Sequence, residues 1–239
     1  MTAAGVGTGP GPITPDGCAV DFYALLPPMG EPPIVHAAVP EAASIVELGC
    51  GTGRLLRPLA ALGHPVLGVD ESPDMLAHVP DLPTVCSRIE TLRLDRRFGA
   101  VLLASTMVNA DPQTRRSFLA TCRRHIGPDG VVVIQQHPPD WFDTVCPREP
   151  EAGGIWAAIR SVERDGTGIR VVIEYRAGGR AWTHAFTPHR VSETELTSDL
   201  ASADLVFGRW LTQDRAWFTA RPAAHKEHTN AGNNSQTVP

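Results

Sequence analysis

The stretch VELGCGTGR, residues 46–54, constrains the fold more than any other part of this chain. A short apolar run, residues 45–48, leads into glycines at three alternate positions, and the apolar pattern LLRPLAAL follows. This order predicts a strand, a tight turn and a helix. Glycines let the turn bend sharply and let a ligand lie against bare backbone, while the helix start offers unpaired N–H groups and a positive dipole end. The stretch is typical of the first crossover of a nucleotide-binding α/β sheet.

The spacing of the glycines distinguishes between classes of nucleotide. The dinucleotide fingerprint G-x-G-x-x-G needs glycine at position 54, where this chain has Arg54. The pattern is instead G-x-G-x-G, preceded by Glu47, whose carboxylate repels a pyrophosphate and suits a cationic ligand. These residues resemble motif I of the class I S-adenosylmethionine-dependent methyltransferases, whose usual form is close to (V/L)(D/E)xGxGxG. The resemblance implies S-adenosyl-L-methionine as cofactor, held at its methionine end by a loop that contains Glu47, Gly49, Cys50, Gly51 and Gly53.

Length and charge limit the possible partners. The 239 residues suit one α/β domain, and 42% hydrophobic with 20% charged residues is typical of a soluble globular protein. A net charge of −5 disfavours a nucleic-acid partner, because binding to a phosphate backbone needs a basic face. The sequence has neither a long apolar span nor a basic-then-apolar leader, so we expect no membrane insertion and no secretion.

Cysteine and lysine usage narrows the chemistry. The five cysteines are odd in number and widely spaced, which favours reduced thiols in the cytoplasm. The chain has no CxxC motif, which would be the usual sign of a zinc site. The single lysine, Lys226, lies in a polar tail. A Schiff-base lysine and a phosphate-binding P-loop lysine in the folded domain are therefore excluded. Acid-rich metal ligands are not evident, since Asp140 and Asn109 alone would be too few.

The N-terminal region divides into two parts. Residues 1–18 are rich in glycine and proline and are expected to be disordered. Residues 19–43 contain prolines that favour two short helices, or a helix and a loop, over one long helix. The resemblance implies that this region caps the cofactor, which makes Tyr23 a candidate lid and substrate-pocket residue. A tyrosine packed at the core edge is the alternative.

A second buried strand is expected at residues 66–69, and it ends in Asp70. An acid at this place, 17 residues past Gly53, is where a doubly wound fold binds ribose hydroxyls. A helix-capping acid is the alternative. Ser72 is the expected N-cap of the next helix, and the remaining cofactor candidates of this segment are Glu71 and Met75.

A third strand is expected at residues 83–88. In the resembling family this place commonly reads GDA, and its acid meets the adenine amino group. The matching positions here are Arg88 and Ile89, so the usual acid is missing. Ile89 can still flank the adenine, and Glu90 can take the polar contact, although an exposed acid at a helix start is an equal alternative.

The continuous apolar run at residues 99–105 predicts a central parallel strand buried on both faces. Its carboxyl end faces the crevice where open α/β sheets bind ligands. Ser105 is therefore a cofactor candidate, and the substrate-pocket candidates that follow are Thr106, Met107 and Asn109. Asp111 and Pro112 open a helix that GPDG closes, and VVVIQ, residues 131–135, supplies the fifth strand.

The sequence QHPPDW, residues 136–141, follows the fifth strand. It looks superficially like the (D/N/S)PP(Y/F/W) signature of some amino methyltransferases, but that signature belongs after the fourth strand, so we treat the likeness as coincidental. His137 lies at a strand's carboxyl end and is the candidate general base. A satisfied structural histidine is the alternative. Trp141 is a further substrate-pocket candidate.

From Ile155 onward the pattern changes to strands joined by turns at Asp165-Gly166 and Gly178-Gly179. It predicts an antiparallel insertion at about residues 154–190, and in the resembling family such an insertion forms a wall of the substrate pocket. The wall candidates are Trp156, Tyr175, Trp182 and His184, for which simple packing is a sufficient alternative. A capping box at residues 192–195 opens the next helix, two terminal strands follow, and the tail from residue 222 is expected to be disordered.

Together these features predict an α/β fold with a Rossmann-like, doubly wound, mostly parallel seven-stranded sheet and a small antiparallel insertion after the fifth strand. We expect a methyltransferase domain over residues 19–221 that methylates an O or N atom of a small molecule, such as a specialised metabolite, as a monomer or homodimer. Two alternatives stay open. One is an enzyme of this fold that uses the cofactor's charge without methyl transfer, and the other is a non-catalytic cofactor-binding protein.

Overall fold

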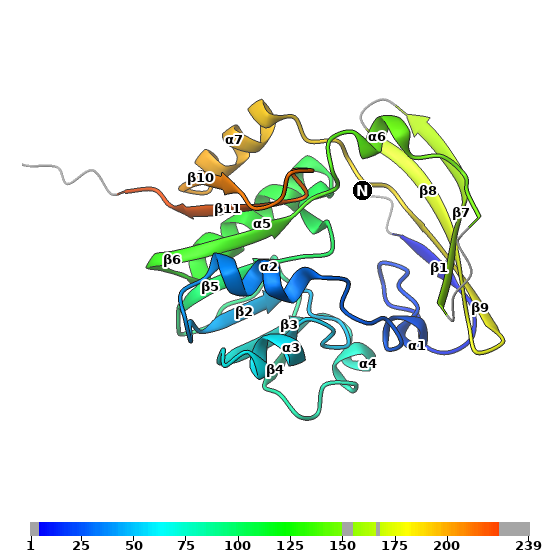
Figure 1. Ribbon diagram of the computed structural model, residues 1–239, viewed down its shortest axis with the longest axis horizontal. Coiled ribbons are helices and arrows are strands. Elements are labelled where there is room, and N and C mark those ends of the chain that lie inside the picture. The colour runs from blue at the N-terminus through cyan, green and yellow to red at the C-terminus, as the bar shows by residue number, and fades with distance from the viewer. Residues whose placement is uncertain (1–4, 150–154, 166–167, 225–239) are drawn as a thin grey trace, which may run out of the picture.

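The computed structural model describes residues 5–149, 155–165 and 168–224, which form two sheets side by side (Figure 1). The larger sheet has seven strands in the order β10-β11-β6-β5-β2-β3-β4. Neighbours from β4 to β6 are parallel, while β11 is antiparallel to both β6 and β10. Its strands are β2 (Ile45–Leu48), β3 (Val66–Asp70), β4 (Thr84–Cys86), β5 (Phe98–Leu103), β6 (Ile126–Gln135), β10 (Leu205–Trp210) and β11 (Trp217–Pro222). The predicted mostly parallel α/β sheet is confirmed.

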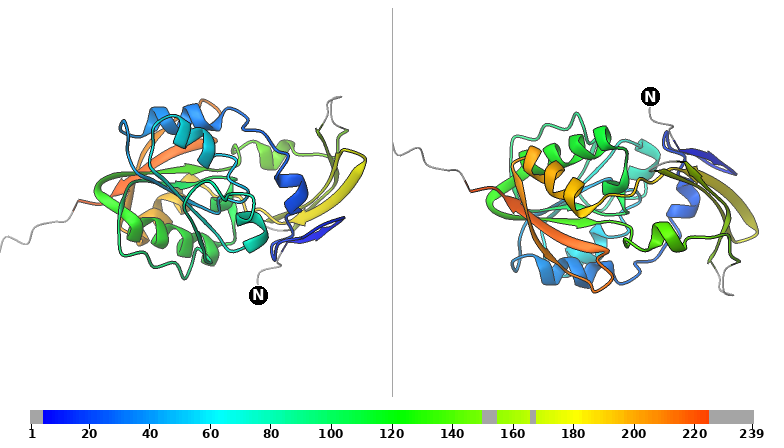
Figure 2. Two further views of the ribbon diagram at one scale, coloured as in Figure 1. Left: turned by 90° about the horizontal axis from the view of Figure 1, so that it is seen from below. Right: turned by 90° about the horizontal axis from the view of Figure 1, so that it is seen from above.

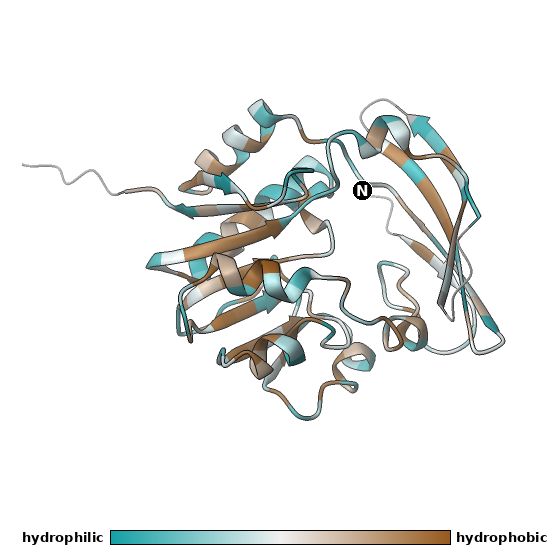
Figure 3. Cartoon of the chain, viewed as in Figure 1, coloured by the Kyte–Doolittle hydropathy of each residue, from teal (hydrophilic) through white to brown (hydrophobic). Residues whose placement is uncertain are grey.

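Helices cover both faces of this sheet, which explains why its central strands are continuously apolar (Figure 3). On one face the side chains of Val46 and Val101 pack with α5 (Pro112–His125) and α7 (Glu193–Ser202). On the other face Ile45 and Leu102 pack with α2 (Glu31–Ala38) and α3 (Leu56–Ala61). The two clusters alternate along each strand because successive side chains point to opposite faces.

The expected helix starts are confirmed by their caps. The Ser72 hydroxyl accepts a hydrogen bond from the Met75 amide at the start of α4 (Pro73–Leu76). Asp111 accepts from two amides at the start of α5, and Ser192 forms a reciprocal capping box with Glu195 at the start of α7. One boundary differs from the expectation. Helix α5 ends at His125 and β6 begins at once with Ile126, so GPDG lies within the strand rather than in a closing turn.

The insertion after β6 forms the second sheet, in the order β1-β9-β8-β7. Its antiparallel strands β7 (Ile155–Asp165), β8 (Gly168–Ala177) and β9 (Arg180–Phe186) match the predicted insertion. The turn at Gly178 and Gly179 has φ angles of 54° and 75°, as a tight hairpin turn requires. Gly166, of the other predicted turn, lies outside the described residues. Figure 2 shows this sheet as a curved wall beside the α/β unit.

The expectation of disorder at residues 1–18 is wrong for residues 5–18. Strand β1 (Val6–Thr8) pairs with β9 and supplies the fourth strand of the insertion sheet. We call residues 5–18 the N-terminal strap. Glycine here permits close backbone packing, because a Cβ on Gly5 would lie 1.9 Å from the Asp16 carbonyl oxygen and a Cβ on Gly7 would lie 2.0 Å from that of Gly17. The expected tail from residue 222 begins in β11, and residues 225–239 lie outside the described part.

The cap region follows the strap and joins the two sheets. It contains α1 (Val20–Tyr23) and α2, which confirms the expectation of two short helices. Phe22 of α1 stacks on Tyr175 of β8, with ring centroids 4.2 Å apart. The Thr52 hydroxyl of the glycine-rich loop donates to the Tyr23 carbonyl over 3.2 Å. The insertion sheet therefore stands beyond the carboxyl ends of the parallel strands, with α1 on one side and α6 (Trp141–Thr144) on the other (Figure 1).

Candidate functional site

The glycine-rich loop between β2 and α3 has the geometry that its sequence predicts. Gly49, Gly51 and Gly53 have φ angles of 73°, 53° and 79°, in the left-handed region that other residues avoid. The amides of Gly49 and Cys50 both donate to the Val69 carbonyl, over 2.8 and 2.9 Å, so the loop folds back onto β3. Further along the turn, the Gly53 amide donates to the Cys50 carbonyl over 3.0 Å.

Asp70 lies at the end of β3 and supports this loop directly. One carboxylate oxygen accepts from the Gly51 amide over 2.8 Å, and the other accepts from the Ser72 amide over 2.9 Å. Burial raises the pKa of Asp70, and these two hydrogen bonds oppose the rise. Ser72 is the N-cap of α4, and Asp70 bonds to the amide of this N-cap residue as well as to the glycine-rich loop.

Glu47 is the most unusual acid of the site. Its side chain is buried, and its Oε2 has no hydrogen-bond partner within the described part of the chain. Burial raises the pKa of Glu47 to about 8, although the nearby positive charge of Arg54 opposes the rise. Arg54 itself is paired with Glu31 of α2. A buried carboxyl group without a partner is costly. The position therefore fits a ligand that brings a cationic amino group, as the methionine end of S-adenosyl-L-methionine does.

The residues expected around the adenine lie in different environments. Ile89 is buried in the core, and Met75 is buried beside the loop, with its sulfur 3.9 Å from where a Cβ on Gly51 would lie. Arg88, at the position of the missing acid, points outward and pairs with Glu90 over 3.0 Å and with Glu71 over 3.9 Å. Both candidate acids therefore face an arginine.

The segment after β5 is strained and held in place. Ser105 and Thr106 have φ angles of 54° and 56°, which are uncommon for residues with a side chain and recur at functional sites. The Ser105 amide donates to the Gln135 side chain over 2.7 Å. The Met107 sulfur lies 2.7 Å from where a Cβ on Gly49 would lie, so this side chain contacts the glycine-rich loop. The structure thereby brings one of the predicted pocket residues, Met107, against the cofactor loop.

His137, just beyond the end of β6, is packed among aromatic rings. Its imidazole stacks on Trp141, with ring centroids 3.9 Å apart and planes inclined by 14°, and its edge meets Phe142. Its Nε2 is buried and has no partner among the described residues. Burial lowers the pKa of His137 to about 4, so the ring is neutral at pH 7. A satisfied structural histidine would have a partner for this nitrogen.

The wall candidates of the insertion divide between its two faces. Tyr175, Trp182 and His184 lie on the face toward α1, since opposed residues of antiparallel strands share a face. Trp182 is buried there, and its Nε1 donates to the Pro10 carbonyl over 2.7 Å, so it packs beneath the strap instead of lining an open pocket. Trp156 neighbours the inward-facing Ala157 in sequence and so lies on the outer face, between Arg160 and Arg176.

Tyr23 and the strap complete the inner side of this wall. Burial raises the pKa of Tyr23 well above its ordinary value, and Cys18 and Tyr175 are its polar neighbours. His184 is buried, its Nε2 lies 3.1 Å from the Asp16 carbonyl oxygen, and its Nδ1 has no partner among the described residues. Sequence reasoning missed the strap residues because glycine and proline suggested disorder. The alternating glycines of residues 5–9 were the available signal for close backbone packing.

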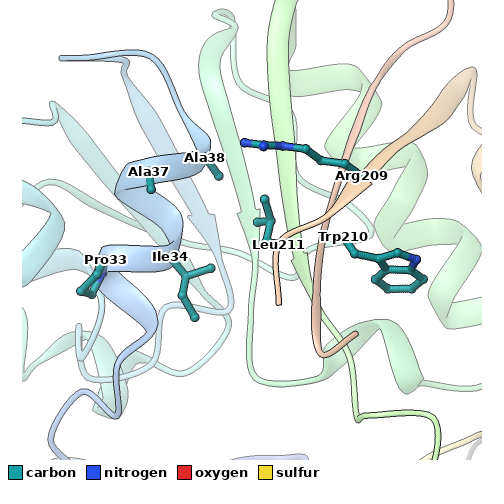
Figure 4. A pocket seen from close by; sticks show the side chains of 7 residues that line it. All are labelled: Pro33, Ile34, Ala37, Ala38, Arg209, Trp210 and Leu211. Atoms are coloured by element: carbon teal, nitrogen blue, oxygen red, sulfur yellow. The ribbon is translucent and has the colours of Figure 1, made fainter. Parts of the chain in front are cut away.

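A separate groove of about 430 Å³ lies between α2 and the end of β10 (Figure 4). Its lining is Pro33, Ile34, Ala37, Ala38, Arg209, Trp210 and Leu211. None of these residues belongs to the glycine-rich loop or to the segments after β5 and β6, so we assign it no part in the site. Within the described ranges, no cluster of three or more His, Cys, Asp or Glu side chains could hold a metal ion. No helix there is long and apolar enough to cross a membrane.

Comparison with known proteins decides the family. A family model described as a methyltransferase domain matches residues 45–130. An N,N-dimethyltransferase of dTDP-3-amino-3,6-dideoxy-alpha-D-glucopyranose from Streptomyces fradiae is 30% identical over 214 residues, which cover 81% of this chain and 83% of that protein. The chain belongs to the S-adenosylmethionine-dependent methyltransferases. It is an enzyme that uses S-adenosyl-L-methionine to methylate a small molecule, and the glycine-rich loop and Glu47 had indicated this cofactor.

Solved structures agree with this methyltransferase in fold. An S-adenosylmethionine-dependent methyltransferase from Clostridium acetobutylicum superposes with a TM-score of 0.67 at 14% identity, covering 86% of this chain and 91% of that one. The CcbJ methyltransferase from Streptomyces caelestis gives the same TM-score at 20% identity, covering 87% and 92%. The methyltransferase therefore shares the arrangement of its elements with these enzymes, while its site residues have to be assigned from its own structure.

Proposed function

We propose that this methyltransferase acts on an amino group of a small hydroxylated molecule, namely an amino sugar carried on a nucleoside diphosphate. The environment of His137 is the reason why we propose nitrogen, and not oxygen, as the atom that is methylated. An imidazole with a pKa of about 4 is a weak base, and a hydroxyl group holds its proton far more strongly. A neutral amine needs no base to attack a methyl group. The buried Nε2 of His137 can accept a hydrogen bond from its N–H and thereby orient it.

The Streptomyces fradiae relative supports the sugar part of the proposal, because its named substrate is an amino deoxysugar linked to dTDP. Its similarity covers 81% of this chain and 83% of that protein, which is enough to include the insertion. In our proposal Trp141 and Met107 contact the acceptor beside His137, and Tyr23 closes the crevice from α1. Thr106 belongs to the strained segment that shapes this side, whereas Trp182 is covered by the strap.

We assign the cofactor contacts as follows. The buried carboxyl group of Glu47 pairs with the amino group of the methionine end, and the carboxylate of Asp70 meets the ribose. We assign the rest of the cofactor to the glycine-rich loop and to Ser105, Met75, Ile89 and one of the acids Glu71 and Glu90. When bound, S-adenosyl-L-methionine would supply an electrophilic methyl group on a sulfonium, and transfer of this methyl group would leave a neutral thioether. The protein contributes mainly by aligning the acceptor with this methyl group.

A substrate pair tests the nitrogen acceptor. The purified enzyme would be incubated with S-adenosyl-L-methionine and dTDP-3-amino-3,6-dideoxy-alpha-D-glucopyranose, or with the same sugar nucleotide carrying a hydroxyl in place of the amine. Mass spectrometry should show one or two added methyl groups on the amine only, with matching formation of S-adenosylhomocysteine. Methylation of the hydroxyl analogue would overturn the choice of nitrogen. If neither sugar nucleotide is methylated while other small amines are, the proposal that the substrate is a nucleotide-linked sugar would be overturned.

His137→Ala tests the residue itself. Loss of one hydrogen bond to the acceptor predicts a fall in kcat/KM of roughly 10-fold to 100-fold, with unchanged affinity for the cofactor. Unchanged turnover would remove His137 from the mechanism.

We also propose that the enzyme works in the cytoplasm, as a monomer or homodimer and without a nucleic-acid partner. The support is indirect. All five cysteines are free thiols, as a reducing compartment favours, and the net charge of −5 gives no advantage on a phosphate backbone.

A further inference from the structure

Two of the segments that join the insertion sheet to the α/β unit lie at one place, and we call them the hinge segments. The chain leaves the larger sheet after Gln136, whose amide still donates to the Ala216 carbonyl, and runs through residues 137–140. It returns to the larger sheet through residues 187–191 before α7. His137 lies in the outgoing segment and His189 in the returning one. Both hinge segments must be held at fixed positions if the insertion sheet is to keep a constant distance from the carboxyl edge of the larger sheet.

One side chain, Asn109, bonds to both hinge segments. Its Oδ1 accepts from the His137 amide over 2.8 Å, and its Nδ2 donates to the His189 carbonyl over 3.0 Å. A third bond runs between backbones, where the His189 amide donates to the Asn109 carbonyl over 2.7 Å. Asn109 is only 3% exposed, so water does not compete for these bonds.

The segment that presents Asn109 is tied to β6. It ends the short 3-10 helix η1 (Met107–Asn109), which follows the two left-handed residues Ser105 and Thr106. The Ser105 amide is tied to Gln135 at the end of β6. The side chain of Asn109 is therefore presented from a strained loop that is anchored to the same strand from which His137 emerges.

We propose that Asn109 is a positioning residue. Its side chain fixes the position of His137 and, at the same time, the position of the insertion sheet relative to the α/β unit. The inference rests on the proposed function of His137. Asparagine suits the task because one short side chain offers both an acceptor for an amide and a donor for a carbonyl. Aspartate has the acceptor without the donor, and it would place a carboxylate against the His189 carbonyl.

The surroundings of His137 make its pKa a direct reporter of this arrangement. Burial is the cause of the low value, and the titratable groups on the neighbouring elements are Asp140 and Asp143 near α6 and His189 and Arg190 in the returning segment. Arg190 pairs with Asp143 and lies over Phe142. Loss of the Asn109 bonds would let water reach the ring, which would raise the pKa of His137 toward its ordinary 6.5.

The test compares Asn109→Ala and Asn109→Asp with a matched control, Gln136→Ala. Gln136 is also buried and donates to a backbone carbonyl, that of Arg215, but it lies outside the hinge bonds. The pKa of His137 would be measured by nuclear magnetic resonance of the ring in each full-length protein. We expect it to rise in Asn109→Ala, to rise further in Asn109→Asp because of the added negative charge, and to stay low in Gln136→Ala. A low value in all three would overturn the proposal.

Kinetics and hydrogen exchange complete the test. In the two Asn109 variants kcat should fall by about tenfold or more while the dissociation constant of the cofactor stays within about twofold. In the wild-type protein the amides of His137 and His189 should exchange slowly, and fast exchange would overturn the proposal even if no variant folds. If His137→Ala is fully active but the pKa shifts still occur, the proposed role of His137 fails while the positioning by Asn109 stands.

Discussion

The imidazole of His137 lies against the indole of Trp141, with centroids 3.9 Å apart and planes 14° from parallel. The stack fixes the plane of the ring and covers one of its faces. It thereby contributes to the burial that keeps the histidine neutral, and Nε2 has no partner among the described residues. The same contact joins the end of β6 to α6 and so to the insertion.

Removal of this stack should change both the histidine and the reaction. Trp141→Ala exposes the ring, so the pKa of His137 should rise from about 4 toward 6.5, and kcat/KM for the acceptor should fall by about tenfold or more. Trp141→Phe should keep most of the activity. Trp156→Ala, on the outer face of the insertion, is the control and should leave the kinetics unchanged. Equal losses in Trp141→Ala and Trp156→Ala would contradict this account.

Glu47→Gln should separate cofactor binding from stability. The folded protein holds Glu47 with a pKa of about 8, above its ordinary 4.5, so its burial opposes folding increasingly as pH rises through this range. Without ligand, the variant should melt at a higher temperature than the wild type near pH 8. Its affinity for S-adenosyl-L-methionine should be weaker by about 1.5–3 kcal/mol, the range for a hydrogen bond to a charged group.

The pH dependence of cofactor affinity tests the same residue. In the wild type, affinity should strengthen as pH rises toward about 8, because an ammonium ligand pairs with the carboxylate. Glu47→Gln should lose this dependence, and calorimetry can measure both. An unchanged slope in the variant would be evidence against the assigned pairing.

Asp70→Ala should weaken cofactor binding more than Ser72→Ala. Asp70 holds the Gly51 amide and is the proposed ribose contact, whereas Ser72 only caps α4. Loss of the cap should cost about 1 kcal/mol of stability with nearly normal cofactor affinity. Thermal melting and calorimetric titration of both variants would check this. Similar affinities in the two would show that Asp70 serves the helix and not the cofactor.

Acid should destabilise the fold through its buried histidines. Burial lowers the pKa of His137 to about 4, and it also lowers those of His125 and His184. Since the unfolded chain binds protons that the folded chain does not, this stability is complete above pH 6.5 and is lost as pH falls toward 4. The share of His137 is at most about 3 kcal/mol. Denaturant titrations should show a shallower acid dependence in His137→Gln, and an identical dependence would disprove the assignment.

Gly7→Ala should disturb the strap by steric conflict. The new Cβ would lie 2.0 Å from the Gly17 carbonyl oxygen, so the paired segments must separate. We expect a loss of about 1–3 kcal/mol and faster proteolysis near the N-terminus. Gly178→Asn is the control, since a Cβ there meets nothing within 4 Å and asparagine tolerates its positive φ. Proteolysis at the wild-type rate in Gly7→Ala would contradict the tight packing.

Much of this protein follows from local sequence. The glycine spacing, Glu47 and Asp70 determine the cofactor loop, because a turn with left-handed residues and a strand-end acid depend on few neighbours. The order of strands and helices follows from apolar runs and caps, since each is a property of one short segment. For this reason the α/β sheet, the helix starts and the class of cofactor were predictable.

The tertiary structure decided what depends on residues distant in sequence. Order in the strap arises only when Gly5 and Gly7 meet residues 16 and 17 and β1 reaches β9. Trp182 became a core residue because the strap covers it. The neutrality of His137 and the double role of Asn109 need α6, η1 and the returning hinge in one place. Burial and hydrogen-bond partners of this kind are set by packing, and no local pattern encodes them.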